Sequence, residues 1–267
     1  MKPIVIKLGG SLLNPIPDDL CENIASFIRD TDMQPIIIHG GGPHVSTMLE
    51  KLDIPTAFQD GLRVTDESAL HVAEMVLSGS LNKQLVRHLQ KYHVPSLGIS
   101  GVDGKMISVE PMKEDGSLGY VGKVVHVDTS LVSSLLEAAW VPVISPLGTD
   151  EDHEAYNINA DTAAGAVAQA LHAPLIYVTN VDGVVESTEN GAIHHPHLTD
   201  RATRNLIENG VISGGMIPKV EAALESVSQG VEEVVILNGL NARSLTEYHL
   251  SSTIGTRFTK EEKLNYA

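Results

Sequence analysis

The chain has 267 residues, of which 42% are hydrophobic, 34 are acidic and 18 are lysine or arginine, giving a formal net charge of −16. This charge repels a polyanion and leaves no basic stripe, which argues against a nucleic-acid partner. No apolar run approaches the roughly 20 residues of a membrane-spanning helix, no signal-peptide pattern precedes the first strand, and Cys21 is the single cysteine. We therefore expect a cytoplasmic globular protein with no membrane partner and no disulfide framework.

Strand-like and helix-like segments alternate along the chain. The strand-like runs are nearly continuous in apolar residues, as in a parallel sheet covered on both faces: 4–8, 35–39, 96–100, 141–146, 175–179 and 233–238. The helix-like segments are 18–30, 45–52, 67–92, 130–139, 161–171, 200–208, 219–229 and 242–249. This pattern predicts a doubly wound α/β fold with ligands at the carboxyl ends of the strands, and a lobe boundary near 170–174.

A lysine interrupts the first apolar strand just before the turn Gly9-Gly10-Ser11. Lys7 could lie at an edge with its ammonium in water, or at the carboxyl end of a central strand where it meets an anion. A second strand also runs straight into glycines, Gly40 to Gly42, and then into a helix. Glycine lets backbone approach a ligand, and free N–H groups at a helix start suit phosphate or carboxylate. The two turns together favour a site for two anions.

Three polar stretches further along the chain are candidates for the same site. Arg63 precedes a helix capped by Thr65 or Asp66. Its guanidinium either forms two parallel hydrogen bonds with a carboxylate or is exposed at the surface. Asn157 and Asn159 stand before a helix of small residues that starts near Asp161. They are either cap and turn residues or side chains that grip a polar ligand, with Asp161 against a lysine, and the second interpretation explains both asparagines.

The C-terminal third offers two further candidates. The turn after the strand at 175–179 contains Asp182-Gly183 and is suited to a nucleotide base or ribose. Lys219 lies in the first turn of a helix after paired glycines, where its charge opposes the helix dipole unless an anion is present. We therefore interpret Lys219 as a second phosphate-facing cation.

Two other segments have more than one interpretation. The stretch 105–127 breaks the alternation and predicts an inserted β-hairpin, which is either a lid or a surface ornament. His194-His-Pro-His197 is more typical of a solvated loop than of a metal site, and we predict no metal bound by protein side chains. The chain also lacks a P-loop, a dinucleotide fingerprint, a nucleophile elbow and a His-Glu-x-x-His motif.

Taken in order, these motifs resemble the amino acid kinase family over essentially the whole chain. The set is Ile-Lys7-Leu-Gly-Gly, His-Gly-Gly-Gly42, Gly-Leu-Arg63-Val-Thr, Ser-Gly-Ser-Leu-Asn82-Lys, Asn157-x-Asn-Ala-Asp161, Val-Asp182-Gly and Gly-Gly-Met-Ile-Pro-Lys219. Within the family the chain is most similar to members that phosphorylate the γ-carboxylate of N-acetyl-L-glutamate in arginine biosynthesis. The resemblance implies a three-layer αβα sandwich around a mostly parallel sheet, in one domain spanning 1–267. It also implies an N-lobe, about 1–172, that binds acetylglutamate and dimerises, and a C-lobe, about 173–267, that binds ATP.

The resemblance also implies residue roles. Lys7 and Lys219 would stabilise the transferred phosphoryl group, and Asp161 would hold the two lysines. The acetylglutamate site would contain Gly41, Gly42, Arg63, Asn157 and Asn159. Mg²⁺ would arrive with ATP, and the nucleotide would contact Gly9, Gly10, Ser11, Asn180, Val181, Asp182, Gly183, Val184, Val185, Val211, Ile212 and Ser213. Asn180 departs from the aspartate of many relatives, which affects the nucleotide contacts.

Assembly and substrate choice are the remaining expectations. Arginine-inhibited family members carry an extra N-terminal helix that links dimers into a hexamer, whereas only Met1, Lys2 and Pro3 precede the first strand here. We therefore expect a homodimer insensitive to L-arginine. Alternative functions are a kinase of acetylaminoadipate, another family kinase, or an inactive nucleotide-binding regulator. The presence of Lys7, Asp161 and Lys219 argues against the last.

Overall fold

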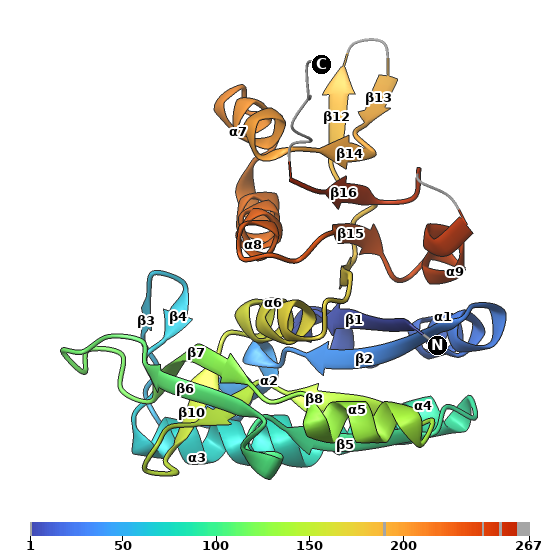
Figure 1. Ribbon diagram of the computed structural model, residues 1–267. Helices are drawn as coiled ribbons and strands as arrows, with labels where there is room; N and C mark the ends of the chain where they lie inside the picture. The colour runs from blue at the N-terminus through green and yellow to red at the C-terminus, as the bar shows by residue number, and fades with distance from the viewer. Residues whose placement is uncertain (1, 189–190, 242, 251–252, 261–267) are drawn as a thin grey trace, which may run out of the picture.

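The computed structural model describes residues 2–188, 191–241, 243–250 and 253–260 (Figure 1). An eight-stranded sheet runs through the molecule in the order β14-β16-β15-β11-β1-β2-β8-β5. All of its neighbouring strands pair in parallel except β15 and β16. The strands are β1 (Lys2–Leu8), β2 (Met33–His39), β5 (Ser96–Ser100), β8 (Val141–Ser145), β11 (Leu175–Thr179), β14 (His197–Leu198), β15 (Val234–Asn238) and β16 (Thr256–Phe258).

Helices cover both faces of this sheet, so the predicted αβα layering is confirmed. Figure 1 places α6 and α8 on one side of the strands and α1 and α9 on the other. The helices are α1 (Asp18–Asp30), α2 (Gly42–Lys51), α3 (Glu67–Glu74), α4 (Asn82–Lys91), α5 (Ser130–Glu137), α6 (Ala160–Ala170), α7 (Asp200–Glu208), α8 (Ile217–Ser228) and α9 (Ser244–Leu250). The expected start of the last helix, Ala242, lies outside the described residues.

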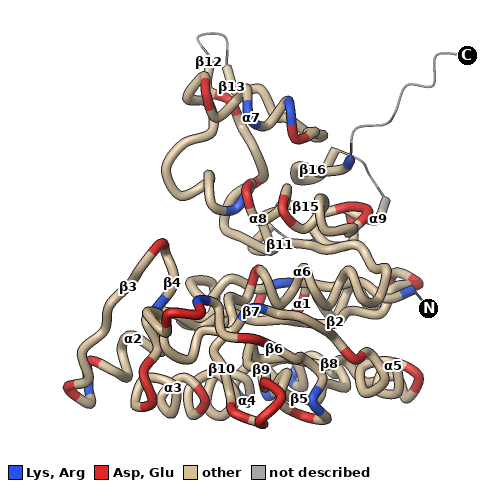
Figure 2. The backbone as a smooth tube through the Cα atoms, turned by 60° about the vertical axis from the view of Figure 1, so that its left-hand side comes forward, with Lys and Arg blue, Asp and Glu red and all other residues tan. Residues whose placement is uncertain are grey.

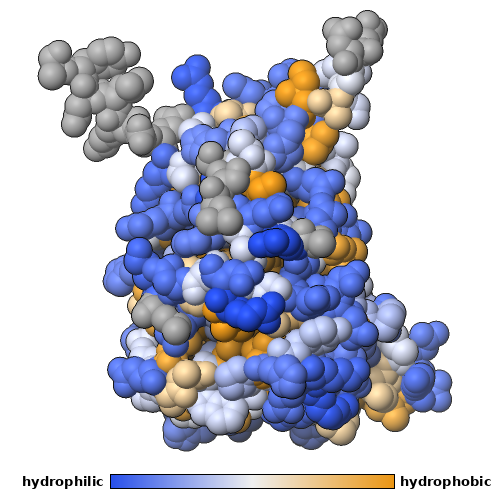
Figure 3. Space-filling view, turned by 90° about the vertical axis from the view of Figure 1, so that its right-hand side faces the viewer, coloured by the Kyte–Doolittle hydropathy of each residue, from blue (hydrophilic) through white to orange (hydrophobic). Residues whose placement is uncertain are grey.

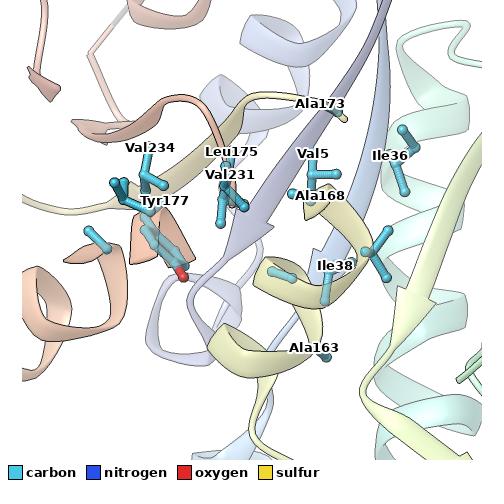
Figure 4. Packing of buried hydrophobic residues seen from close by; sticks show 14 of the residues in the cluster. Val5, Ile36, Ile38, Ala163, Ala168, Ala173, Leu175, Tyr177, Val231 and Val234 are labelled. Atoms are coloured by element: carbon cyan, nitrogen blue, oxygen red, sulfur yellow. The ribbon is translucent and has the colours of Figure 1, made fainter. Parts of the chain in front are cut away.

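Alternation along the central strands divides the core between the two faces. In β1, Ile4, Ile6 and Leu8 pack with α1 and α4, whereas Val5 packs with the buried alanines of α6. Figure 4 shows Val5, Ile38 and Ala168 meeting in this second layer. Because successive side chains of a strand point to opposite faces, Lys7 follows Val5 onto the face covered by α6 and α8.

The predicted hairpin is present and belongs to a small barrel. β6 (Ile107–Pro111) and β7 (Val121–Val127) pair in antiparallel fashion, and β9 (Leu147–Thr149) and β10 (Ala155–Ile158) complete a closed four-stranded barrel. Sequence reasoning missed the last two strands and two further hairpins, β3 (Phe58–Gln59) with β4 (Leu62–Arg63) and β12 (Val185–Thr188) with β13 (Gly191–His194). Backbone bonds from Thr65 to Leu118 and Tyr120 tie the β6–β7 loop to the segment after Arg63.

The segment predicted as one helix over 67–92 contains a π-helical turn. Residues 75–81, between α3 and α4, form the π-helix η2 (Met75–Leu81). A π-helical turn shifts the register of the side chains that follow it and is often found at functional sites. Here Leu77 and Leu81 pack against the second glycine turn. A Cβ on Gly41 would lie only 2.4 and 2.8 Å from their Cδ2 atoms.

The surface is polar and acidic in character. Figure 2 shows acidic residues along the backbone in both the upper and the lower part of the molecule, and Figure 3 shows a face that is mostly hydrophilic, with small separate apolar areas. None of the described helices is long and apolar enough to cross a membrane. Cys21 is buried, and desolvation raises the pKa of its thiol to about 12, which is typical of a core residue rather than a nucleophile.

Candidate active site

Three charged residues from three different elements meet at the carboxyl ends of the central strands. Lys7 is the last residue but one of β1, Asp161 lies in the first turn of α6, and Lys219 lies in the first turn of α8. Lys7 Nζ is 2.8 Å from Asp161 Oδ1. Burial and the charge of Lys7 lower the pKa of Lys219, and Asp161 opposes this shift. Two cations and one carboxylate leave a positive centre in an acidic protein, which is the arrangement an anionic ligand requires.

Two cavities adjoin this cluster. One, of about 250 Å³, is lined by the first glycine turn, Asn180 and Lys219; the other, also of about 250 Å³, is lined by the second glycine turn and Arg63. Lys7, Gly10 and Asp161 line both cavities. A group bound in one cavity would therefore meet a group bound in the other at Lys7. We refer to them as the donor cavity, with Lys219, and the acceptor cavity, with Arg63.

The two glycine turns touch each other through backbone atoms. A Cβ on Gly10 would lie 2.7 Å from the nitrogen and 2.9 Å from the Cα of Gly41, and Gly40 donates its N–H to the carbonyl of Leu8. Real Cβ contacts are never this short, so a side chain at Gly10 would push the turns apart. Glycine is thus required here to bring two helix starts together, the 3₁₀-helix η1 (Gly10–Leu13) and α2.

Arg63 is buried at the wall of the acceptor cavity, which excludes the surface interpretation. Its Nη2 donates to the carbonyl of Gly42 at 3.1 Å and to Ser46 Oγ at 2.6 Å, and the guanidinium lies 4.7 Å from the Phe58 ring centre. Its Nη1 is buried and has no hydrogen-bond partner among the described residues. Burial lowers the pKa of Arg63. The unpartnered N–H groups suit an anionic ligand, because an unsatisfied buried charge is costly.

Asn157 and Asn159 were predicted either to cap and turn the chain or to bind a ligand, and their contacts differ. Asn159 is the N-cap of α6, where its Oδ1 accepts from the backbone N–H groups of Asp161 and Thr162 at 2.8 and 3.3 Å. Asn157 donates to Thr65 Oγ1 at 3.4 Å. Both line the acceptor cavity. The cap therefore fixes the start of the helix that carries Asp161, while Asn157 presents an amide to the cavity.

The residues predicted to hold a nucleotide separate into two groups. Gly9, Gly10, Ser11 and Asn180 line the donor cavity. Sequence reasoning missed six other lining residues: Leu12, Tyr177, Val178, Thr179, Gly215 and Pro218. The remaining predicted residues are not part of that lining: Val181, Asp182, Gly183, Val184, Val185, Val211, Ile212 and Ser213.

Three residues of the second group make contacts within the protein. Val184 and Ile212 are buried in the core. The Asp182 carboxylate accepts from Asn241 at 2.7 Å and from Asn238 at 3.1 Å. These contacts give Asp182 a structural task in the turn, and its contact with a nucleotide stays a prediction.

The histidine-rich loop engages nearby protein groups. His195 Nε2 lies 3.1 Å from Glu186 Oε2, and His194 Nε2 lies 3.1 Å from the carbonyl of Asp182. Within the described ranges there is no group of three or more His, Cys, Asp or Glu residues placed to hold a metal ion.

His39, directly before the second glycine turn, is a buried histidine that sequence reasoning left unassigned. Its Nδ1 lies 3.1 Å from the carbonyl of Gly40 and its Nε2 lies 3.2 Å from Asn82 Nδ2, which also donates to the carbonyl of Val143. A neutral ring with hydrogen on Nδ1 satisfies both neighbours. Burial lowers the pKa of His39 from its ordinary 6.5 to about 4.

This depressed pKa predicts a pH-dependent stability. Between pH 6.5 and 4 the unfolded chain binds a proton at His39 that the folded chain does not, so stability falls as the pH falls, by up to about 1.4 kcal/mol per pH unit. We expect His39→Gln to lose less unfolding free energy between pH 7 and pH 5 than the wild type in urea titrations. An equal loss in both proteins would contradict a neutral buried His39.

Known proteins resemble this chain over nearly its full length. A family model described as "Amino acid kinase family" matches residues 2–238. The chain is 45% identical over 262 residues to an acetylglutamate kinase from Oceanobacillus iheyensis, with 98% of each chain covered. It is 46% identical to one from Geobacillus kaustophilus, with 97% of each chain covered.

Solved structures show the same fold. The structure of smu.665 from Streptococcus mutans UA159 superposes with a TM-score of 0.78 at 31% identity, covering 96% of this chain and 98% of that one. Carbamate kinase from Giardia lamblia bound to AMP-PNP superposes with a TM-score of 0.71 at 15% identity, covering 97% and 99%. At that identity the likeness concerns the fold alone.

Proposed function

The chain belongs to the amino acid kinase family, and on that premise we propose that it transfers the γ-phosphoryl group of ATP to the γ-carboxylate of N-acetyl-L-glutamate, in the second step of arginine biosynthesis. The relatives named acetylglutamate kinase, which match nearly the whole chain, support this activity. The observation that carries the assignment within the structure is the meeting of two anion-binding cavities at one lysine. We place N-acetyl-L-glutamate in the acceptor cavity and ATP in the donor cavity.

The residues of the site fit the chemistry of this transfer. A γ-carboxylate with an ordinary pKa of about 4.3 is ionised at neutral pH, so it needs no general base before an oxygen attacks the γ-phosphorus. As that bond forms, the bond from phosphorus to the β,γ-bridging oxygen breaks, leaving an acyl phosphate and ADP. The protein must chiefly neutralise charge on a loosely bonded phosphoryl group. Lys7 lies where the two cavities join, and Lys219 lines the donor cavity.

A divalent metal accompanies ATP in this reaction, and we propose Mg²⁺. Asp161 is the one acidic side chain among the described residues that line the two cavities, and its carboxylate pairs with Lys7. This donor set fits a metal that is held by the ATP phosphates and keeps several of its waters. When bound, Mg²⁺ neutralises phosphate charge, while Asp161 orients Lys7. We also propose a cytoplasmic location, where ATP is supplied.

A coupled assay of ADP release tests the function. The purified protein is offered MgATP with N-acetyl-L-glutamate, glutamate, aspartate, acetylaminoadipate or UMP at matched concentrations. We expect N-acetyl-L-glutamate to give the highest kcat/KM and free glutamate to be a much poorer substrate. Preferred turnover of UMP, aspartate or acetylaminoadipate would assign another family activity. If none of the five compounds caused ADP release, the proposal would be contradicted.

Arg63→Lys should raise the KM for N-acetyl-L-glutamate with little change in kcat. Lysine is a point charge that cannot keep Ser46, Gly42 and a substrate carboxylate engaged at once, as the planar fork can. A loss of one charged hydrogen bond corresponds to about 1.5–3 kcal/mol, or roughly 10- to 150-fold in KM. Initial rates over a substrate titration measure the effect. An unchanged KM for N-acetyl-L-glutamate would remove Arg63 from the acceptor site.

We further propose a homodimer formed at the β5 edge of the sheet. Leu97 on β5 and Trp140 just before β8 are both about 40% exposed, although both are large apolar side chains. A second copy would cover them and the open strand edge. Light scattering at micromolar concentration should give twice the chain mass of 28.6 kDa, and Leu97→Lys should reduce it to a monomer. A wild-type monomer, or a dimer unaffected by Leu97→Lys, would contradict this interface.

A further inference from the structure

Tyr177 lies beneath the charged cluster although no motif pointed to it. It is on β11 directly opposite Lys7 on β1, and its side chain is buried. Lys7 Nζ is 6.0 Å from the centre of its ring. Figure 4 shows the Tyr177 ring in the layer between the strands and the helices, with its hydroxyl pointing away from β11.

The Tyr177 hydroxyl reaches one acceptor on each of two helices. It lies 3.1 Å from Ser226 Oγ on α8 and 3.4 Å from the carbonyl of Asp161 on α6. Ser226 Oγ donates its own hydrogen to the carbonyl of Ala222 at 2.9 Å. With Ser226 donating to Ala222, the single hydrogen of the phenol is shared between the two acceptors. Burial, followed by the charge of Asp161, raises the pKa of Tyr177 and keeps it protonated.

The two helices approach closely at this point. A Cβ on Gly165 of α6 would lie 2.7 Å from Ser226 Oγ and 3.5 Å from Ser226 Cβ, so a side chain at Gly165 would displace the hydroxyl that Tyr177 contacts. Ser226 is seven residues after Lys219, which places both on the same stripe of α8 about 10 Å apart. The contact at Ser226 therefore sets how the first turn of α8 is directed toward the first turn of α6.

We propose that Tyr177 is a positioning residue that fixes the separation of α6 and α8, and through them the placement of Asp161 and Lys219 around Lys7. The inference rests on the proposed function. Preorganised charges stabilise a transition state only when they are held in place, and small displacements lower the rate more than substrate affinity. The hydroxyl acts through other groups, so its removal should affect kcat selectively.

Tyr177→Phe tests this role because it removes the hydroxyl alone. We expect kcat to fall about tenfold, with the KM values for ATP and N-acetyl-L-glutamate within about twofold of wild type. Ser226→Ala removes the partner and should give a similar fall. The double variant should be little worse than either single variant, because the two changes break one shared contact. Ser226→Ala carries the test if Tyr177→Phe does not fold.

Tyr248→Phe is the matched control. Tyr248 on α9 is also a buried tyrosine, and its hydroxyl donates to Glu233 Oε1 at 2.6 Å, outside both cavities. We expect it to lower the melting temperature while leaving kcat unchanged. Three outcomes would overturn the inference. They are a wild-type kcat for both Tyr177→Phe and Ser226→Ala, a kcat loss in Tyr248→Phe equal to that in Tyr177→Phe, and additive kcat losses in the double variant. Wild-type protein that releases no ADP with N-acetyl-L-glutamate would overturn the proposed function, and this inference with it.

Discussion

Lys219→Ala is expected to lower kcat by about 10²- to 10³-fold, the scale seen when one preorganised donor is removed from a transition state. Lys219 lies in the first turn of α8, where a cation opposes the helix dipole. Burial and the charge of Lys7 lower the pKa of Lys219, so both disfavour its positive charge in the free protein. The negative charge of a bound phosphate offsets both effects. The charge should therefore count most when the phosphoryl group is between donor and acceptor, and less in ground-state binding.

Steady-state kinetics with both substrates measure this effect. The KM values should change much less than kcat, and the melting temperature should not fall, because removing a partly buried, repelled charge removes an unfavourable interaction. Lys51→Ala, at the exposed end of α2, is a control for the loss of a lysine elsewhere. Near-wild-type kcat in Lys219→Ala would exclude Lys219 from phosphoryl transfer, and a rise in the KM for ATP alone would make it a binding residue.

The features that the sequence predicted are those set by short-range rules. A nearly continuous apolar strand, followed at once by glycine and a helix start, predicts that Lys7 lies on a central strand, at the edge of the sheet where the strands have their carboxyl ends. The motif order predicted the family, which the comparisons confirm. The six predicted strands are six of the eight in the central sheet; the two that were missed, β14 and β16, have two and three residues and too little pattern to recognise.

The features that were missed depend on contacts between distant segments. Tyr177 is one apolar residue in an apolar strand until Ser226 and Asp161 are brought to its hydroxyl. Likewise, nothing local shows that the helix at 67–92 contains a π-helical turn whose leucines close on Gly41. Asn159 was predicted to bind a ligand because two asparagines exceed what a cap needs; its oxygen caps α6, its side chain also lines the acceptor cavity, and its contact with a ligand stays a prediction. Local patterns locate a site, whereas the shape of the site comes from packing.

Gly10→Ala is the second large expected effect, because the added methyl group meets backbone rather than a flexible side chain. Its Cβ would lie 2.7 Å from the nitrogen and 2.9 Å from the Cα of Gly41, and 3.1 Å from the carbonyl carbon of Gly40. The two turns must separate by a few tenths of an ångström or more. A misplacement of about 1 Å between reacting groups can cost about 10²-fold in rate. We therefore expect kcat/KM for both substrates to fall by up to about 10²-fold, since Gly10 lines both cavities.

Gly79→Ala separates this local effect from a general cost of replacing glycine. Gly79 is exposed in η2, a Cβ there meets nothing within 4 Å, and alanine favours a helical backbone by up to about 1 kcal/mol. Its kcat/KM should stay at the wild-type value with an unchanged or higher melting temperature, whereas overpacking in Gly10→Ala should also cost about 1–3 kcal/mol of stability. If Gly10→Ala loses that stability but keeps wild-type kcat/KM at a temperature where it is folded, then contact between the turns supports the fold alone, and their close approach is not what aligns the two substrates.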